Sequence, residues 1–124
     1  MTQTQTIPVS TLRRLAHRYD PAMRRRVAEN ENTPLAILML LAQDSCSEVR
    51  VAVAQNPVTP DYVIGALAQD CDLNVRLGMA EDTQTPVPIL GFLARDCNPY
   101  IAAIAAKTIE IVQANSPQYV EPYG

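Results

Sequence analysis

Apolar residues along this chain gather in two alternating sets of short clusters, and each set repeats every 26 positions. In the first set, aliphatic residues lie three or four positions apart, as in Ile37, Leu38 and Leu41. In the second set, two apolar residues lie four positions apart, as in Val49 and Val53. Intervals of three and four place side chains on one face of an α-helix. The pattern therefore predicts two amphipathic helices in every repeat.

Two kinds of dipeptide mark where these helices begin. Thr-Pro recurs at 33–34, 59–60 and 85–86, and a threonine N-cap followed by proline at the first helical position is a common helix start. Asp-Pro at 20–21 and Asn-Pro at 98–99 mark the other start. We expect longer helices near 8–18, 34–44, 60–70 and 86–96, and shorter helices near 21–29, 47–55, 73–81 and 99–114.

The repeat indicates the fold class. Helices of about ten residues are marginally stable alone, so stacking must provide most of their stability. Self-similarity at a fixed period of this size is typical of stacked repeat proteins. We therefore expect an all-α fold, an α-solenoid or superhelix of about four two-helix repeats over residues 7–114, with a disordered N-terminus at 1–6 and a flexible C-terminal tail at 115–124.

A charged pair also follows the repeat. Asp44 and Arg50 lie six positions apart across a turn, and the same pair recurs one repeat later. We expect a ladder in which each arginine bridges its own aspartate and one from a neighbouring repeat. Arg18 replaces the aspartate in the first repeat, and Ala102 replaces the arginine in the last. Atypical end repeats of this kind are common in stacked arrays.

The net charge of −3 conceals a strong asymmetry. Residues 1–26 carry six arginines and one aspartate, or 6 − 1 = +5, so the remainder carries −3 − 5 = −8. The first repeat can carry this charge because no neighbour covers it, or the cluster can bind an anion, a nucleic acid or an acidic protein. The overall acidity argues against nucleic acid. The arginines are Arg13, Arg14, Arg18, Arg24, Arg25 and Arg26.

A second candidate site is apolar. Met39 and Leu40 occupy the phase at which the first repeat has Arg13 and Arg14, and Phe92 occupies the phase of Leu40. A position that accepts arginine is expected to face outward. We therefore expect Met39, Leu40 and Phe92 to form part of an exposed face, with core packing as the alternative for Phe92. Exposed apolar clusters often mark interaction sites.

No catalytic or metal-binding constellation can be assembled from the sequence. His17 is the only histidine, and no nucleophile or acid lies at a spacing that would pair with it as a general base. Cys71 and Cys97 lie one repeat apart, and Cys46 is out of phase by one position. Stacked helices lie about 8–10 Å apart, whereas thiolates that share a zinc ion each lie about 2.3 Å from it. We expect no enzyme, no cofactor, and cysteines that are small buried packing residues.

The sequence also bears on location. No stretch reaches the roughly 18–20 apolar residues that cross a bilayer, and residues 1–6 are polar without a basic or hydrophobic leader pattern. Three cysteines are an odd number, which favours free thiols. We expect a cytoplasmic protein that does not contact a membrane.

One stretch supports a family resemblance. Val-Arg-Val-Ala-Val-Ala-Gln-Asn-Pro-Val-Thr-Pro at 49–60, continued by Leu-Ala-Gln-Asp at 67–70, resembles the leucine-rich repeat variant family, a bacterial repeat family. The resemblance covers roughly residues 7–114, and the chain is also similar to HEAT-like repeats. It implies a right-handed solenoid in which α-helices alternate with shorter helices, some of them 3₁₀, without β-strands.

These observations predict a non-catalytic protein-interaction or scaffold module. Its curved repeat surface would bind a protein partner, and the basic N-terminal end would suit an acidic one. One alternative is a nucleic-acid or phosphate binder that uses the same arginines. Another is a self-assembling structural subunit, a weak homo-oligomer in which the basic end of one molecule meets an acidic face of another.

Overall fold

The computed structural model describes residues 7–115, and in that range the chain forms eight α-helices and no strand. The predicted all-α fold class is confirmed. The predictions of disorder at 1–6 and of a flexible tail at 115–124 fall, apart from Asn115, on residues outside the described range. The helices are α1 (Val9–Leu15), α2 (Pro21–Glu29), α3 (Leu35–Leu41), α4 (Ser47–Gln55), α5 (Asp61–Leu67), α6 (Leu73–Glu81), α7 (Val87–Leu93) and α8 (Pro99–Ala114).

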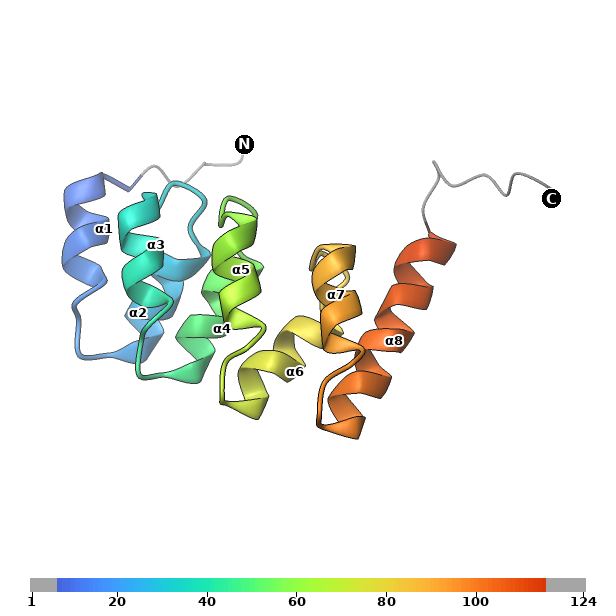
Figure 1. The fold of residues 1–124 in the computed structure, drawn as a ribbon. Coiled ribbons are helices and arrows are strands. Elements are labelled where there is room, and N and C mark those ends of the chain that lie inside the picture. Colours follow the sequence, from blue (N-terminus) through green and yellow to red (C-terminus); the bar gives the residue numbers. More distant parts are fainter. Residues whose placement is uncertain (1–6, 116–124) are drawn as a thin grey trace.

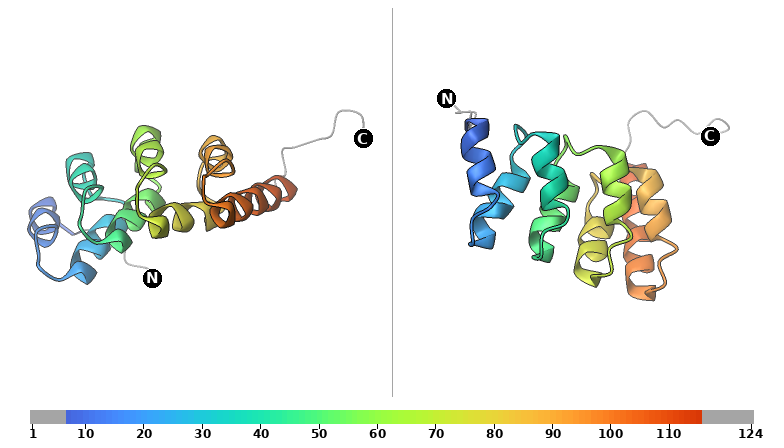
Figure 2. Two further views of the ribbon diagram at one scale, coloured as in Figure 1. Left: turned by 60° about the horizontal axis from the view of Figure 1, so that its bottom comes forward. Right: turned by 60° about the vertical axis from the view of Figure 1, so that its left-hand side comes forward.

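The helices lie in two layers (Figures 1 and 2). In one layer, α2, α4, α6 and α8 pack against one another in sequence order. In the other, α1, α3, α5 and α7 stand in a row, and each packs on one or two helices of the first layer. Each repeat of the sequence therefore contributes one helix to each layer.

The core lies between the two layers and is built from the predicted apolar stripes. In the α3 layer, Ile37, Leu38 and Leu41 are at most 5% exposed. In the α4 layer, Val49 and Val53 are fully buried. The equivalent positions of the other repeats that are also buried are Leu12, Val27, Val63, Ile64, Leu67, Val75, Met79, Leu90, Leu93, Ile101 and Ala105. The helical periodicity of the sequence thus assigns most of the core correctly, although Met23 and Ile89, at the same phases, are only partly buried.

The predicted threonine N-caps are wrong. Pro34, not Thr33, is the N-cap residue of α3, and no side chain caps that helix. Thr33 is buried, and its hydroxyl donates to the carbonyl of Val27, 2.6 Å away, near the end of the preceding helix. A buried hydroxyl needs a hydrogen-bond partner, and the carbonyls of a helix C-terminus lack partners within the helix. The same bond recurs from Thr59 to Val53 and from Thr85 to Met79.

The relative helix lengths are also the reverse of the prediction. The helices that follow Thr-Pro have seven residues, whereas α2, α4 and α6 have nine. After α3, the amides of Gln43 and Asp44 donate to the carbonyls of Leu40 and Leu41, three residues back. Such bonds tighten the last turn and end the α-helical pattern. All eight helices are α-helices, so none of the described helices has the 3₁₀ form that the family resemblance allows.

The aspartate and asparagine caps of the other helix set are confirmed. The side chain of Asp20 accepts a hydrogen bond from the amide of Ala22, with Pro21 at the start of α2. Asp72 and Asn98 cap α6 and α8 in the same way. Cys46 occupies this position before α4 and makes no capping bond. A side-chain oxygen at the N-cap satisfies an amide that has no partner within the helix.

Gly78 marks a close approach between α4 and α6. A Cβ atom at this position would lie 3.0 Å from Cγ1 of Val51, which is closer than ordinary van der Waals contact. The absence of a side chain therefore lets these two helices pack closely. Gly91 has no atom within 4 Å of the equivalent point, so no such close approach occurs at that glycine.

The buried side-chain amide of Asn56, which directly follows α4, joins two successive repeats. Asn56 is 3% exposed, and its Nδ2 donates to the carbonyls of Ala28 and Asn30 at 2.8 and 3.0 Å. Its Oδ1 accepts the amide of Val58 at 3.0 Å. Asn56 thus ties the turn after α4 to the C-terminal end of α2.

The next repeat has a different residue at this point. Asp82 takes the place of Asn56, and Thr108 takes it one repeat later. The hydroxyl of Thr108 donates to the carbonyl of Ala80 at 2.6 Å, which is equivalent to the bond from Asn56 to Ala28. The carboxylate of Asp82 accepts the amide of Gln84, but an ionised carboxylate has no proton to donate. The middle of the array therefore lacks one cross-repeat hydrogen bond.

Replacing that carboxylate by an amide is expected to stabilise the fold. Asp82→Asn adds a donor that can reach the carbonyl of Ala54, and a net hydrogen bond contributes about 0.5–1.5 kcal/mol. We expect the free energy of unfolding in urea at neutral pH to rise by that amount. Glu110→Gln, on the exposed side of α8, removes the same charge and is expected to change little. A stability for Asp82→Asn equal to that of Glu110→Gln would contradict the proposed bond.

Candidate partner-binding face

The layer of seven-residue helices carries most of the side chains that the sequence suggests for binding. We call the exposed side chains of α1, α3, α5 and α7 the outer face. Met39, Leu40 and Phe92 are 46%, 45% and 51% exposed, so all three belong to it and Phe92 is not a core residue. Arg13 and Arg14 are exposed on α1, at the N-terminal end of the same row.

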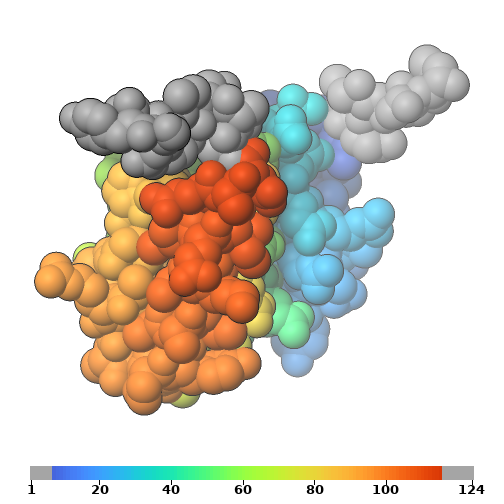
Figure 3. Space-filling model, turned by 90° about the vertical axis from the view of Figure 1, so that its right-hand side faces the viewer, coloured from blue at the N-terminus to red at the C-terminus, as the bar shows by residue number. Residues whose placement is uncertain are grey.

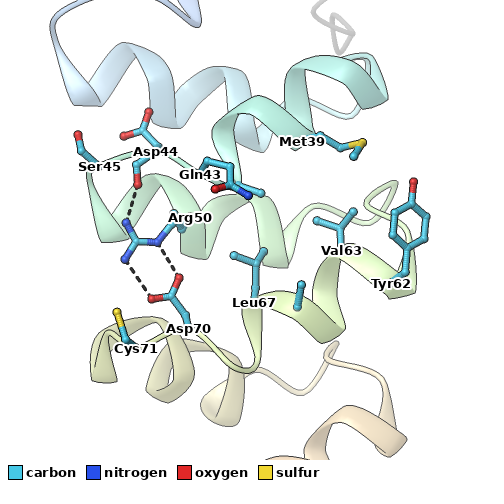
Figure 4. A pocket seen from close by; sticks show the side chains of 12 residues that line it. Met39, Gln43, Asp44, Ser45, Arg50, Tyr62, Val63, Leu67, Asp70 and Cys71 are labelled. Atoms are coloured by element: carbon cyan, nitrogen blue, oxygen red, sulfur yellow. Dashed lines mark hydrogen bonds and ion pairs between the residues drawn. The ribbon is translucent and has the colours of Figure 1, made fainter.

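A groove of about 580 Å³ opens on this face between α3 and α5. Met39 and Tyr62 lie at one end of it, and Asp44, Arg50 and Asp70 lie at the other (Figure 4). The groove is therefore apolar at one end and polar at the other. Val63, Ala66 and Leu67 also line it.

Tyr62 is the main contributor that the sequence did not suggest. Its side chain belongs to α5 and is 64% exposed. The equivalent residues of the other repeats are Ser10, Ala36 and Pro88, so no repeated aromatic position pointed to it. The only signal in the sequence was a large side chain at a repeat position that smaller residues occupy in the other repeats.

A second hollow of about 470 Å³ lies one repeat further on. Phe92 and the exposed Arg95 line it, together with Arg76 and Asp96. Asp70 lines both this hollow and the first groove. The two concavities therefore follow one another along the outer face.

The polar end of the first groove is one step of the predicted ladder. Nε and Nη2 of Arg50 donate to the two carboxylate oxygens of Asp70 at 2.8 and 3.2 Å. Nη1 of Arg50 donates to the main-chain carbonyl of Asp44 (Figure 4). The arginine thus bridges two repeats, as predicted, but it contacts its own aspartate through the backbone and not through the carboxylate. Arg24 with Asp44 and Arg76 with Asp96 repeat this geometry, and we call the three pairs the Arg–Asp ladder.

The carboxylate of Asp44 does not bind Arg50 because both of its oxygens already have other hydrogen-bond partners. Its Oδ1 accepts the amide of Cys46 at 2.9 Å and Nη2 of Arg24 at 3.0 Å. Its Oδ2 accepts Nε of Arg24 at 2.7 Å. Both oxygens are therefore engaged by the preceding repeat and by the turn that the aspartate itself begins. Bidentate pairs of this kind combine strength with fixed geometry.

The ladder also alters the acidity of its carboxyl groups. Burial raises the pKa of Asp44 and Asp70, but the hydrogen bonds from arginine and from a backbone amide, together with the arginine charges, outweigh it and place both pKa values below the ordinary 3.8. At Asp96 the hydrogen bond from Arg76 is the largest influence, and that pKa is lowered too. All three groups are therefore held in the ionised form.

Both ends of the ladder are satisfied without the missing residues. At the first repeat, Nη1 of Arg24 donates to the carbonyls of Arg18 and Tyr19 at 2.7 and 2.8 Å. A main-chain carbonyl is available whatever the side chain, so the absence of aspartate at position 18 leaves these bonds of Arg24 intact. At the last repeat, Asp96 pairs with Arg76 of the preceding repeat, so Ala102 leaves it with a partner.

The six N-terminal arginines have different roles. Arg24 belongs to the ladder, with only 14% of its side chain exposed. Arg25 is exposed but lies 3.1 Å from the carboxylate of Glu29 and 3.8 Å from that of Glu48. Within residues 7–115, the other four make no ion pair with any acidic group. These exposed residues are Arg13, Arg14, Arg18 and Arg26.

The cysteines differ from the prediction. Cys71 and Cys97 are exposed and Cys46 is partly buried, so the first two are not core residues. Each exposed cysteine directly follows a ladder aspartate, in the turn that opens onto the outer-face hollows. His17 is exposed, with its Nδ1 3.0 Å from the carbonyl of Arg13.

Comparison with known proteins does not assign this chain to a family. No protein-family model, no curated protein and no solved structure matches the chain. Among residues 7–115, no group of three or more histidine, cysteine, aspartate or glutamate side chains is placed to hold a metal ion. None of the helices in that range has both the length and the apolar character needed to cross a membrane.

The ladder predicts a specific loss of stability. Arg50→Ala removes three hydrogen bonds and leaves the carboxylate of Asp70 partly buried without its cation. Hydrogen bonds to charged groups contribute about 1.5–3 kcal/mol, and we expect the free energy of unfolding to fall by that amount. Arg25→Ala, which breaks an exposed pair, should lower it by only about 0.3–0.5 kcal/mol. An unchanged Tm for Arg50→Ala would contradict the ladder's role.

The lowered carboxyl pKa values predict acid sensitivity. Because the folded pKa lies below the unfolded value of 3.8, the ladder's contribution is complete above pH 3.8 and is lost as pH falls through the folded value. We expect the free energy of unfolding to decline as pH falls below about 4. In Arg50→Ala this decline should be shallower, because Asp70 has lost its largest stabilising partner. Parallel declines in the two proteins would show that other groups control acid unfolding.

Proposed function

We propose that this chain is a non-catalytic protein-interaction module that presents its outer face to a protein partner. The proposal includes the finer architecture, a right-handed α-solenoid of about four repeats like those of the leucine-rich repeat variant and HEAT-like families. Support for that architecture comes from the regular repeat and from one helix per layer in each unit. Stacked repeats produce extended surfaces suited to partner binding. The family resemblance and the free cysteines favour a bacterial cytoplasm.

The observation that carries the proposal is the cluster of large apolar side chains on one exposed face. Met39, Leu40, Tyr62 and Phe92 are each about half exposed or more, and grooves lie beside them. Exposed apolar side chains that gather beside a concavity are typical of interaction sites. The opposite layer offers a hollow of about 440 Å³ lined by Arg25, Glu29, Glu48 and other mostly polar residues, which fits a solvated surface.

Catalysis is not part of the proposal because the perturbed titratable groups are already paired. Among residues 7–115, the three arginines and three aspartates of the Arg–Asp ladder have displaced pKa values. A perturbed pKa suggests chemistry when the group is available to a substrate. Here each guanidinium and carboxylate is engaged across a repeat boundary, so the shifts report structure.

A nucleic-acid or phosphate binder is the first alternative. The four exposed arginines without ion pairs in the described range favour it. The exposed Tyr19 follows Arg18, but the aromatics that line the outer-face concavities, Tyr62 and Phe92, lie on α5 and α7, whereas these arginines belong to α1, the turn after it and α2. Single-stranded nucleic acids are usually held by cations and stacking aromatics in the same groove.

The self-assembling subunit is the second alternative, and the ends of the ladder bear on it. Head-to-tail stacking would place the first repeat of one copy on the α7–α8 end of another (Figure 3). The ladder positions that would then meet are Arg18 and Ala102, and these cannot form the carboxylate–guanidinium pair that joins internal repeats. A second copy would therefore lack the interaction that orders its neighbours within the chain.

Capture from a lysate of the source cells tests the proposal. The double variant Met39→Asp/Tyr62→Asp places charge on two exposed side chains of the groove, and we expect it to lose the captured proteins, with affinity reduced about tenfold or more, or at least 1.4 kcal/mol. Lys107→Glu on α8 is the matched control and should retain them. Both variants should keep the wild-type Tm. An identical set of captured proteins from all three would rule out the outer face.

A further inference from the structure

We propose that the partner is an acidic segment with a large apolar anchor. Its carboxylates would lie against Arg13, Arg14 and Arg18, and its anchor would enter the groove between α3 and α5. The inference depends on the proposed function, since it assigns a partner to the outer face.

The charge on α1 indicates the first part of this partner. Arg13, Arg14 and Arg18 are exposed and make no ion pair within residues 7–115. Arg25 differs, because Glu29 and Glu48 lie beside it. Guanidinium groups bind carboxylates through paired hydrogen bonds. The unpaired arginines of α1 and of the turn after it therefore suit glutamate or aspartate side chains from a partner.

The groove indicates the second part. Met39 and Tyr62 flank its apolar end, and a methionine adapts its shape to an inserted side chain. At the polar end, the guanidinium of Arg50 is already held by the carboxylate of Asp70 and the carbonyl of Asp44. That end consequently offers no free charge to a ligand. The groove therefore selects an aromatic or aliphatic anchor and not a second acidic group.

The repeat places these two subsites next to each other. Arg13 and Arg14 on α1 occupy the same phase as Met39 and Leu40 on α3, and α1 and α3 stand side by side in the row (Figures 1 and 2). Directly packed helices lie about 8–10 Å apart, which is a lower limit for α1 and α3, and an extended chain advances about 3.3 Å per residue. An extended partner therefore needs roughly three to five residues between its acidic side chains and its anchor.

The same surface argues against a nucleic acid as the occupant. The cationic run on α1 is followed along the row by Met39 and Leu40 and then by the exposed Asp61 and Tyr62 on α5, and an exposed arginine next lines the face at Arg95, beside Phe92. A nucleic acid carries charge along its whole length and needs cations at each step. A segment that is acidic at one end and apolar at the other matches both parts of the face.

A peptide selection tests the inference. Random peptides of about twelve residues, long enough for both subsites at about 3.3 Å per residue, are selected on the immobilised wild-type protein near physiological salt. We expect enrichment of sequences with aspartate or glutamate three to five residues from phenylalanine, tryptophan, leucine, isoleucine or methionine. An enriched peptide is then synthesised for fluorescence anisotropy, with an oligothymidylate as the competitor.

The variants separate the two subsites. Arg13→Glu/Arg14→Glu is expected to weaken the peptide at least tenfold and to remove most of its salt dependence. Met39→Asp/Tyr62→Asp should weaken it about as much, whereas Lys107→Glu should not change it. Each of these side chains is exposed, and a wild-type Tm for each variant excludes unfolding as the cause.

Several results would overturn the inference. Neutral or basic peptides that still depend on Met39 and Tyr62 would refute the acidic partner while leaving the proposed function intact. Peptides insensitive to both double variants, or no enrichment at all, would count against the inference and the outer face together. Displacement by the oligothymidylate, combined with no acidic consensus, would assign the arginines of α1 to nucleic acid instead.

Discussion

The bidentate pair between an arginine of one repeat and an aspartate of the next orders the whole array. In each pair the guanidinium reaches both oxygens of a carboxylate in the following repeat, and it also donates to a backbone carbonyl in its own. One side chain therefore fixes both the distance and the rotation between adjacent units. Apolar stripes such as that of Leu38 and Leu41 supply most of the burial, but hydrophobic packing is non-directional and would tolerate a shifted register. The Arg–Asp ladder removes that freedom.

Periodicity made much of this predictable from sequence. The buried stripes and the cross-repeat charge pairs follow from residue type and spacing, because the same environment recurs in every unit. Three features could not be inferred so easily. A threonine hydroxyl before proline can accept a hydrogen bond from an amide of the next helix or donate one to a carbonyl of the previous helix. Thr33 is buried and donates to the previous helix. Cys71 resembles a core residue in type but lies in an exposed turn, and Tyr62 breaks the pattern of its own position.

The ladder also shapes the surface that we assign to binding. Because Arg50 is saturated by Asp70 and by a carbonyl, the inner end of the groove is polar yet nearly neutral. A ligand gains little binding energy by bringing charge there. The choice of ligand therefore depends on the apolar end beside Met39 and on the unpaired arginines of α1. The Arg–Asp ladder thus holds the helices in place, and the apolar and basic parts of the outer face are left to determine which partner binds.

The presence of arginines in the first repeat has two separate explanations. Within residues 7–115 no repeat precedes this one to supply a guanidinium to position 18, so an aspartate there would lack its cation, and Arg18 avoids an unpaired carboxylate. End capping therefore accounts for Arg18. It does not account for Arg13 and Arg14, which occupy the outward phase of Met39 and Leu40, where no ladder partner is needed. Charge at those two positions relieves no structural deficit, and this makes them the strongest candidates for contact with an acidic partner.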